Sequence, residues 1–152
     1  MIAVDTNVLI YAHRAEMELH GTAKEQLVTL AEGDEPWVVP VFCITEFLRV
    51  VTHTRVFNPP STASEALDFL DGLLASPSCT VANPETAFMN RLDAVVRESR
   101  ARGNLIFDAQ VAALCREHGI PTILTNDRDF ERFKPLRAVY LESTANTRGP
   151  SP

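Results

Sequence analysis

Acidic side chains recur in this sequence just after short apolar runs or near the start of helix-like segments. Four of them share this placement: Asp5, Glu46, Asp108 and Asp127. Gathered together, their carboxylates would repel one another, and no Lys or His lies beside them in sequence to neutralise them. Hard divalent cations with oxygen ligands, Mg²⁺ or Mn²⁺, are the natural counterions. The pattern therefore favours metal-assisted hydrolysis of a phosphodiester, with water as the nucleophile.

Each acid taken singly also has a purely structural explanation. An acid in the first turns of a helix stabilises the helix dipole by ~0.3–1 kcal/mol, which would account for Glu46 or Asp108. Asp5 could cap a helix that follows it, and Asp127 could cap the segment after it. Coincidence explains the placement of any one acid more easily than it explains the placement of all four. The metal hypothesis therefore depends on a fold that brings them together.

The elements that would position these acids are short apolar strands alternating with helices. Strands are predicted over residues 1–4, 37–39, 79–81, 122–124 and 138–141, and helices over 8–12, 21–31, 42–52, 61–75, 84–102 and 106–117. Thr6 or Asn7 is expected to cap the first helix, and Gly103 to end the helix over 84–102. This alternation implies a three-layer α/β/α domain with a mainly parallel sheet of about five strands. Ligands bind such sheets outside the carboxyl ends of the strands, where the acids could gather.

Length and composition fit one such domain and exclude several other classes of protein. The chain has 152 residues, 45% of them hydrophobic, and a net charge of −6. We expect a single domain over residues 1–142 and a polar, disordered tail over 143–152. No segment approaches the ~20 apolar residues of a membrane helix, and no basic leader opens the chain. The acidic balance argues against a general nucleic-acid coat, but not against an enzyme that binds cations first.

The cysteines indicate the compartment. Cys43, Cys79 and Cys115 are an odd number of thiols and form no Cys-x-x-Cys pair. Each lies among apolar or small residues, which is typical of buried, reduced thiols. We therefore expect a cytoplasmic protein without a disulfide framework or a structural zinc site.

Four segments match the motifs of a known family, in the same order. They are Ile-Ala-Val-Asp-Thr-Asn-Val-Leu at 2–9, Thr-Glu-Phe at 45–47, Phe-Asp-Ala at 107–109 and Thr-Asn-Asp-Arg-Asp-Phe at 125–130. On these segments the chain resembles the PIN-domain ribonucleases, and more narrowly the VapC-type toxins of bacterial toxin–antitoxin pairs. The resemblance covers residues 1 to about 141, and the ordered set is more specific than any one segment.

The resemblance implies a PIN fold and an endoribonuclease that depends on Mg²⁺ or Mn²⁺ and hydrolyses RNA with metal-activated water. By position, the four acids named above would be the catalytic and metal-binding residues. Three neighbours would support them: Thr6, Asn7 and Asp129. The resemblance also implies an RNA substrate, with tRNA or another structured RNA as possible targets. A cognate antitoxin that blocks the site, and commonly a homodimer, are its further implications; no membrane is involved.

Basic residues gather toward the end of the predicted helix over 84–102. Arg97, Arg100 and Arg102 could contact the RNA backbone close to the acidic edge. A solvated helix face explains them equally well, because Arg is favourable near a helix C-terminus.

Two other functions stay open. A receiver-like signalling module also holds Mg²⁺ with acids at strand ends, but it needs an acidic pair after the first strand, where Thr6 and Asn7 follow Asp5. A catalytically silent interaction domain could have kept the fold without the metal. Stable acylphosphate formation would favour the first alternative, and absence of Mn²⁺ binding would favour the second.

Overall fold

The sheet is parallel throughout and is built from strands that lie far apart in sequence. A computed structural model describes residues 1–141, so the predicted tail over 143–152 lies outside the described residues. The strands are β1 (Ile2–Val4), β2 (Trp37–Pro40), β3 (Cys79–Ala82), β4 (Thr122–Thr125) and β5 (Arg137–Tyr140). Their order is β3-β2-β1-β4-β5, and each neighbouring pair is parallel. The predicted five-stranded parallel sheet is therefore confirmed within residues 1–141.

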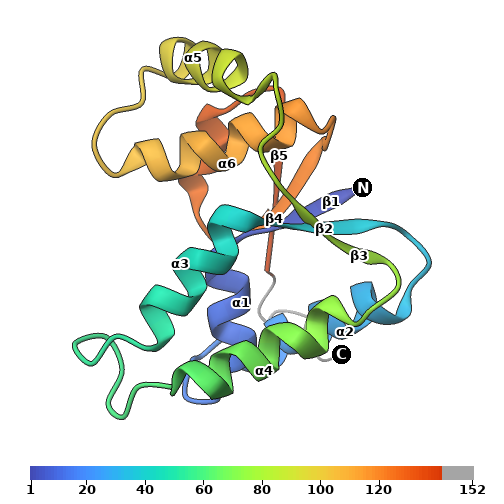
Figure 1. Ribbon diagram of the computed structural model, residues 1–152, viewed down its shortest axis with the longest axis vertical. Helices are drawn as coiled ribbons and strands as arrows, with labels where there is room; N and C mark the ends of the chain where they lie inside the picture. Colours follow the sequence, from blue (N-terminus) through green and yellow to red (C-terminus); the bar gives the residue numbers. More distant parts are fainter. Residues whose placement is uncertain (142–152) are drawn as a thin grey trace, which may run out of the picture.

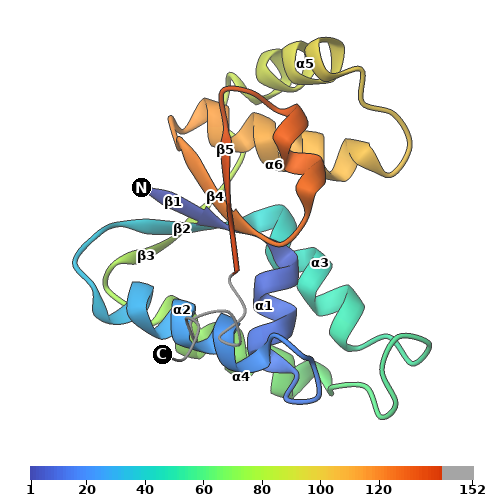
Figure 2. The same cartoon turned by 180° about the vertical axis from the view of Figure 1, so that it is seen from behind.

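Helices cover both faces of this sheet (Figure 1). They are α1 (Thr6–His13), α2 (His20–Glu32), α3 (Val41–Val51), α4 (Ala63–Leu74), α5 (Phe88–Ser99) and α6 (Leu105–Glu117). Helices α1 to α4 lie on one side of the sheet and α5 and α6 on the other, as the view from behind also shows (Figure 2). The chain runs outward from β1 to β3 and then crosses back to β4. Right-handed crossovers in opposite directions place their helices on opposite faces, which gives the expected three layers.

The reversal of strand order falls between β1 and β4. Val4 is in register with Leu124, and the backbone N–H of Asp5 donates to the carbonyl oxygen of Leu124 at 3.0 Å. In open parallel sheets a ligand site forms outside the carboxyl ends of the strands at such a switch point. The fold therefore places the first predicted acid where a site is expected.

Apolar strands and helix faces form one core around the sheet. All residues of β2 are buried, and Trp37, Phe47 and Phe130 are among the largest fully buried side chains. The three cysteines are buried and unpaired, as the sequence predicts. No helix within residues 1–141 is long and apolar enough to cross a membrane.

The predicted helix over 84–102 is too long at both ends. Its first residues form an irregular segment and a turn before α5 begins. At the other end Arg100 takes a left-handed conformation with φ of 57°, and the N–H of Ala101 donates to the carbonyl of Val96 at 3.3 Å. A left-handed residue followed by a hydrogen bond to a carbonyl five residues earlier terminates an α-helix. Gly103, with φ of 60°, therefore lies in the following loop and does not end the helix.

A short 3-10 helix, η1 (Arg128–Arg132), follows β4 in a segment for which no helix or strand is predicted. Phe130 anchors it, because this side chain is fully buried and its ring packs edge-on against Phe133 with centroids 5.9 Å apart. The residues that precede and follow Arg128 are acidic, so the anchor also fixes two carboxylates.

We expect Phe130→Ala to lower the free energy of unfolding by ~3–5 kcal/mol, because it leaves a cavity under η1. Urea denaturation followed by circular dichroism measures this change. Met89→Ala is the matched control, since that side chain is 67% exposed and its truncation should cost less than ~0.5 kcal/mol. Equal costs for the two variants would show that η1 is not anchored through Phe130.

Candidate metal centre

Asp5 lies at the end of β1 and is the N-cap of α1. This confirms the structural explanation given for Asp5, and the prediction of Thr6 or Asn7 as the cap is wrong. Only 6% of its surface is exposed. The N–H of Thr6 donates to Oδ1 at 2.8 Å, and the Thr125 hydroxyl donates to Oδ2 at 2.8 Å. The Asn7 amide also donates to Oδ2, at 3.2 Å. A buried carboxylate needs such donors, and together they fix the orientation of Asp5.

Thr125 joins the ends of β1 and β4. Its side chain is fully buried, and its hydroxyl oxygen accepts a bond from the N–H of Asp127 at 3.0 Å while its proton goes to Asp5. Asn7 strengthens the same junction, because its Oδ1 accepts from the N–H of Asn126 at 3.2 Å. One hydroxyl therefore links two of the predicted acids.

Glu46 is positioned from the other side of β1. It lies on α3, which follows β2, and its Oε2 accepts a bond from the Thr6 hydroxyl at 3.3 Å. The two neighbours of Asp5 thus divide their contacts, with Thr6 reaching Glu46 and Asn7 reaching the segment after β4.

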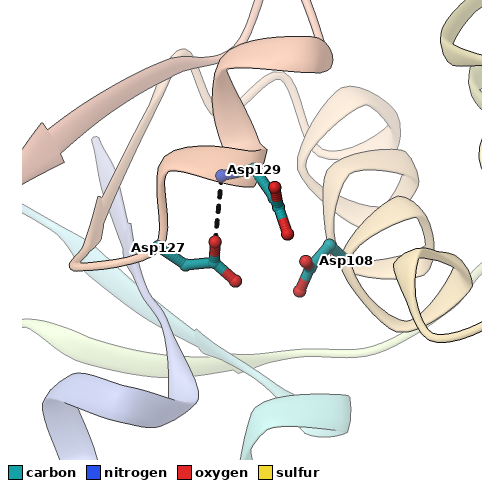
Figure 3. Close-up of side chains that lie close together, drawn as sticks. All are labelled: Asp108, Asp127 and Asp129. Atoms are coloured by element: carbon teal, nitrogen blue, oxygen red, sulfur yellow. Dashed lines mark hydrogen bonds between the residues drawn. The ribbon is translucent and has the colours of Figure 1, made fainter.

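Asp108, Asp127 and Asp129 form the closest group of acids. One carboxylate oxygen of each lies within 4.8 Å of the others. Figure 3 shows the three carboxylates turned toward one space, with Asp108 on α6 and the other two beside η1. Asp127 is the N-cap of η1, and its Oδ1 accepts from the N–H of Asp129 at 2.9 Å. Asp129, to which the sequence gave only a supporting place, therefore joins the innermost group.

These acids line a hollow of about 380 Å³ that opens at the carboxyl edge of the sheet. Its lining residues are Glu46, Arg49, Asn104, Leu105, Phe107, Asp108, Asp127 and Asp129. Asp5 is not among them and lies behind the hollow, held by Thr125. The sequence therefore predicted that the acids gather, but not that Asp5 is buried while the other acids line an open hollow.

The proton affinities of two acids reflect this crowding. Burial, followed by the charges of Asp127, Asp5, Asp129 and Glu46, raises the pKa of Asp108 from 3.8 to about 7. Burial is also the largest cause that raises the pKa of Asp5 from 3.8 to about 6, against the bonds from Thr125 and Thr6 that lower it. All five acids therefore act on one another electrostatically.

The donor set fits a hard divalent cation. Every titratable group in the closest cluster is a carboxylate, and among residues 1–141 no histidine or cysteine lines the hollow. Oxygen-only ligands suit Mg²⁺ or Mn²⁺ better than the softer metals that select nitrogen or sulfur. A cation there would also stabilise the charged form of Asp108, whose pKa is raised first by burial and then by the neighbouring carboxylates.

The predicted basic residues lie outside the hollow. Arg97 is paired with Asp93 at 3.0 Å on the exposed face of α5. Arg100 and Arg102 are exposed in the segment that leads into α6, two residues or more before Asn104, which lines the hollow. Arg49 is the basic residue that does line it.

Sequence reasoning missed five residues of the site: Thr125, which holds Asp5, and Arg49, Asn104, Leu105 and Phe107, which line the hollow. Thr125 leaves a signal, because it is a polar residue at the end of an apolar strand, directly before the acidic segment. Arg49 also leaves one, since it lies three residues after Glu46 and so on the same helix face. Phe107 leaves no signal beyond its place in the Phe-Asp-Ala segment, because an aromatic residue in a helix is usually buried.

We expect the metal-free protein to lose stability as pH rises. The folded-state pKa values of Asp5 and Asp108 are raised, so their contribution to folding is fully present below pH 3.8 and is lost through about 6 and about 7. In EDTA, the Tm of Asp108→Asn should therefore rise above that of wild type with increasing pH, by ~2–4 °C per kcal/mol of repulsion removed. Differential scanning calorimetry measures the gap, with Asp71→Asn on the exposed face of α4 as control. A gap that stays constant from acid to alkaline pH would contradict the expectation.

The comparisons with known proteins agree with this geometry. The family described as PIN domain matches residues 2–135. VapC ribonuclease Mb2897 of Mycobacterium bovis is 39% identical over 137 residues, which are 90% of this chain and 92% of that protein. Ribonuclease VapC31 of Mycobacterium tuberculosis is 34% identical over 139 residues, 91% of this chain and 97% of that protein.

Solved structures share the fold at lower identity. VapBC2 from Rickettsia felis, bound to a DNA fragment from their promoter, has a TM-score of 0.70 at 17% identity, over 93% of this chain and 100% of that one. VapC20 of Mycobacterium tuberculosis, a sarcin-ricin loop cleaving toxin, has a TM-score of 0.63 at 20% identity, over 86% of this chain and 93% of that one. The chain belongs to the PIN-domain family and, within it, to the VapC ribonucleases.

Proposed function

We propose that this chain is an endoribonuclease that depends on Mg²⁺ or Mn²⁺ and acts as the toxin of a toxin–antitoxin pair. The observation that carries the proposal is the convergence of Asp108, Asp127 and Asp129 beside Glu46 in one hollow, with Asp5 behind them. Its relatives at 39% and 34% identity are named as ribonucleases, which supports RNA as the substrate. The reaction is hydrolysis of a phosphodiester bond by water.

The acids have different roles in this proposal. Asp108, Asp127, Glu46 and Asp5 would hold the metal, and the carboxylate of Asp129 would join them. Thr6, Asn7 and the N–H of Asp129 would keep these acids in place. When bound, the ion supplies a Lewis acid that polarises the phosphoryl oxygen and lowers the pKa of water. Asp5 is oriented before any ligand arrives, because both of its oxygens already accept hydrogen bonds from buried or half-buried donors. Without a cation the clustered carboxylates would repel the RNA backbone.

The partners of the toxin follow from its relatives and not from its own geometry. A cognate antitoxin is proposed because a structural neighbour was solved as VapBC2 on a DNA fragment from their promoter. A structured RNA is proposed as the target because another neighbour is a sarcin-ricin loop cleaving toxin. A homodimer acting in the cytoplasm completes the proposal, and the unpaired, buried thiols support that compartment.

No observation favours the receiver-like alternative. A phosphorylated Asp must be open to a phosphodonor, whereas Asp5 is 6% exposed and occupied by Thr6, Asn7 and Thr125. A measurement of Mn²⁺ binding distinguishes the proposal from the catalytically silent interaction domain, because that domain would bind no Mn²⁺.

We expect Asp108→Asn and Asp5→Asn to lower Mn²⁺-dependent RNA cleavage by more than ~100-fold, beyond the ~10–100-fold typical of residues that only orient metal ligands. Thr125→Val removes the hydroxyl that orients Asp5, so this variant should lower the cleavage rate by ~10–100-fold. Cleavage of a labelled RNA, with and without EDTA, gives the rates, and titration calorimetry gives Mn²⁺ affinity. Asp71→Asn is the control for loss of one carboxylate elsewhere. Equal cleavage by wild type and Asp5→Asn would reveal a contaminating nuclease and defeat the proposal.

We also expect the Arg100→Ala, Arg102→Ala double variant to bind single-stranded RNA more weakly. Each lost phosphate contact should reduce the slope of log K against log[salt] by ~0.7. Arg97 should contribute less, because Asp93 already pairs with it. Fluorescence anisotropy at several salt concentrations measures the slope. An unchanged affinity and slope would leave these residues as a solvated helix end.

A further inference from the structure

A second hollow adjoins the acidic one. It measures about 270 Å³ and is lined by Phe42, Thr45, Glu46, Arg49, Phe107 and Gln110. Three of its lining residues, Glu46, Arg49 and Phe107, also line the acidic hollow, so the two hollows adjoin and are together termed the trough. The trough is acidic at one end and uncharged at the other, because the residues that line only the second hollow are Phe42, Thr45 and Gln110.

Phe107 lies at the junction and is an exposed aromatic residue. It is 57% exposed, whereas the next residue along α6, Asp108, turns its carboxylate into the acidic group. Phe42 lines the same hollow from α3, and its half-buried ring packs against Phe88 with centroids 5.6 Å apart. An exposed aromatic ring next to a site for phosphate chemistry is a platform on which a base can stack.

Arg49 is the basic residue of the trough. It is exposed on α3, and within residues 1–141 it forms no ion pair with any of the acids around it. Its charge therefore remains available to an anion at the junction. Proteins that bind single-stranded nucleic acid combine such a positive charge with aromatic side chains.

We infer that the trough holds an unpaired nucleotide of the RNA next to the bond that is cut, with its base on Phe107 and its phosphate at Arg49. The inference rests on the proposed nuclease function and makes it more specific. A hollow of about 270 Å³ is slightly smaller than the ~300–1,000 Å³ typical of small-ligand sites, which suits one base and not a duplex. Because a paired base is stacked on its neighbours, cleavage requires a loop or a single strand.

The test measures RNA binding apart from cleavage. Asp5→Asn, which should not cut, is titrated with a fluorescent single-stranded RNA in Mg²⁺ and followed by anisotropy. Adding Phe107→Ala should weaken binding roughly 5- to 150-fold, the loss of one base–aromatic stack, and Phe107→Tyr should restore it to within ~3-fold of the parent. A fully paired RNA should bind the parent more weakly and lose little on Phe107→Ala. Met89→Ala, another exposed apolar side chain, should leave binding unchanged.

The charge is tested in the same way. Arg49→Gln should reduce the slope of log K against log[salt] by ~0.7, as expected for one phosphate contact on a single strand. Arg137→Gln is the matched control, because Arg137 begins β5 and so lies at the opposite, amino edge of the parallel sheet. Equal slopes for the two variants would remove Arg49 from the subsite.

Three results separate the subsite from the nuclease proposal. Single-stranded binding that does not change on Phe107→Ala overturns the subsite, even if wild type cleaves RNA. Light scattering measures whether Phe107→Ala breaks a dimer. If the dimer and RNA binding are lost together, the ring belongs to an interface between copies and the subsite is overturned. Wild type that cleaves no RNA with Mn²⁺, while Phe107 still controls binding, defeats the nuclease proposal and leaves the subsite standing.

Discussion

Repulsion among carboxylates is the constraint on which the rest of this structure depends. A parallel sheet brings the carboxyl ends of its strands to one edge, and here that edge collects Asp5, Glu46, Asp108, Asp127 and Asp129. Burial and these like charges raise the pKa of Asp108 to about 7. Such a cluster is stable only if protons, donors or a cation offset the charge. The fold supplies hydrogen-bond donors for the buried Asp5 and gathers the other acids in an open hollow, where a divalent cation would offset their charge.

Neutral donors organise the site. Thr6, Asn7 and Thr125 bond Asp5 and connect it to Glu46 and to the segment after β4, so three chain segments share one hydrogen-bond network. Hydroxyl and amide groups can do this without forming the strong ion pairs that Lys or Arg would form with the carboxylates. The acids therefore keep their charge available for a cation, and their geometry depends on residues that have no charge of their own.

The sequence predicted the fold better than the fine structure of the site. Apolar runs alternating with helices were enough for the parallel sheet and its layers, because buried strands leave little ambiguity. The end of α5 was missed, because Arg100 takes a left-handed conformation that usually marks Gly. The closeness of Asp129 to Asp108 was missed too, because it depends on η1, whose path is set by the burial of Phe130. Contacts between distant segments, such as that of Thr125 with Asp5, require tertiary structure that local patterns do not contain.

The central place of β1 affects how the molecule is made on the ribosome. This strand is synthesised first, yet it is completed in the sheet only when β4, some 120 residues later in the chain, pairs with it. Thr125, Asp127 and Asp129 emerge at the same late stage. A nascent chain therefore lacks these residues of the acidic site for most of translation. The RNA of the cell therefore meets a folded nuclease only after β4 has been made and has paired with β1.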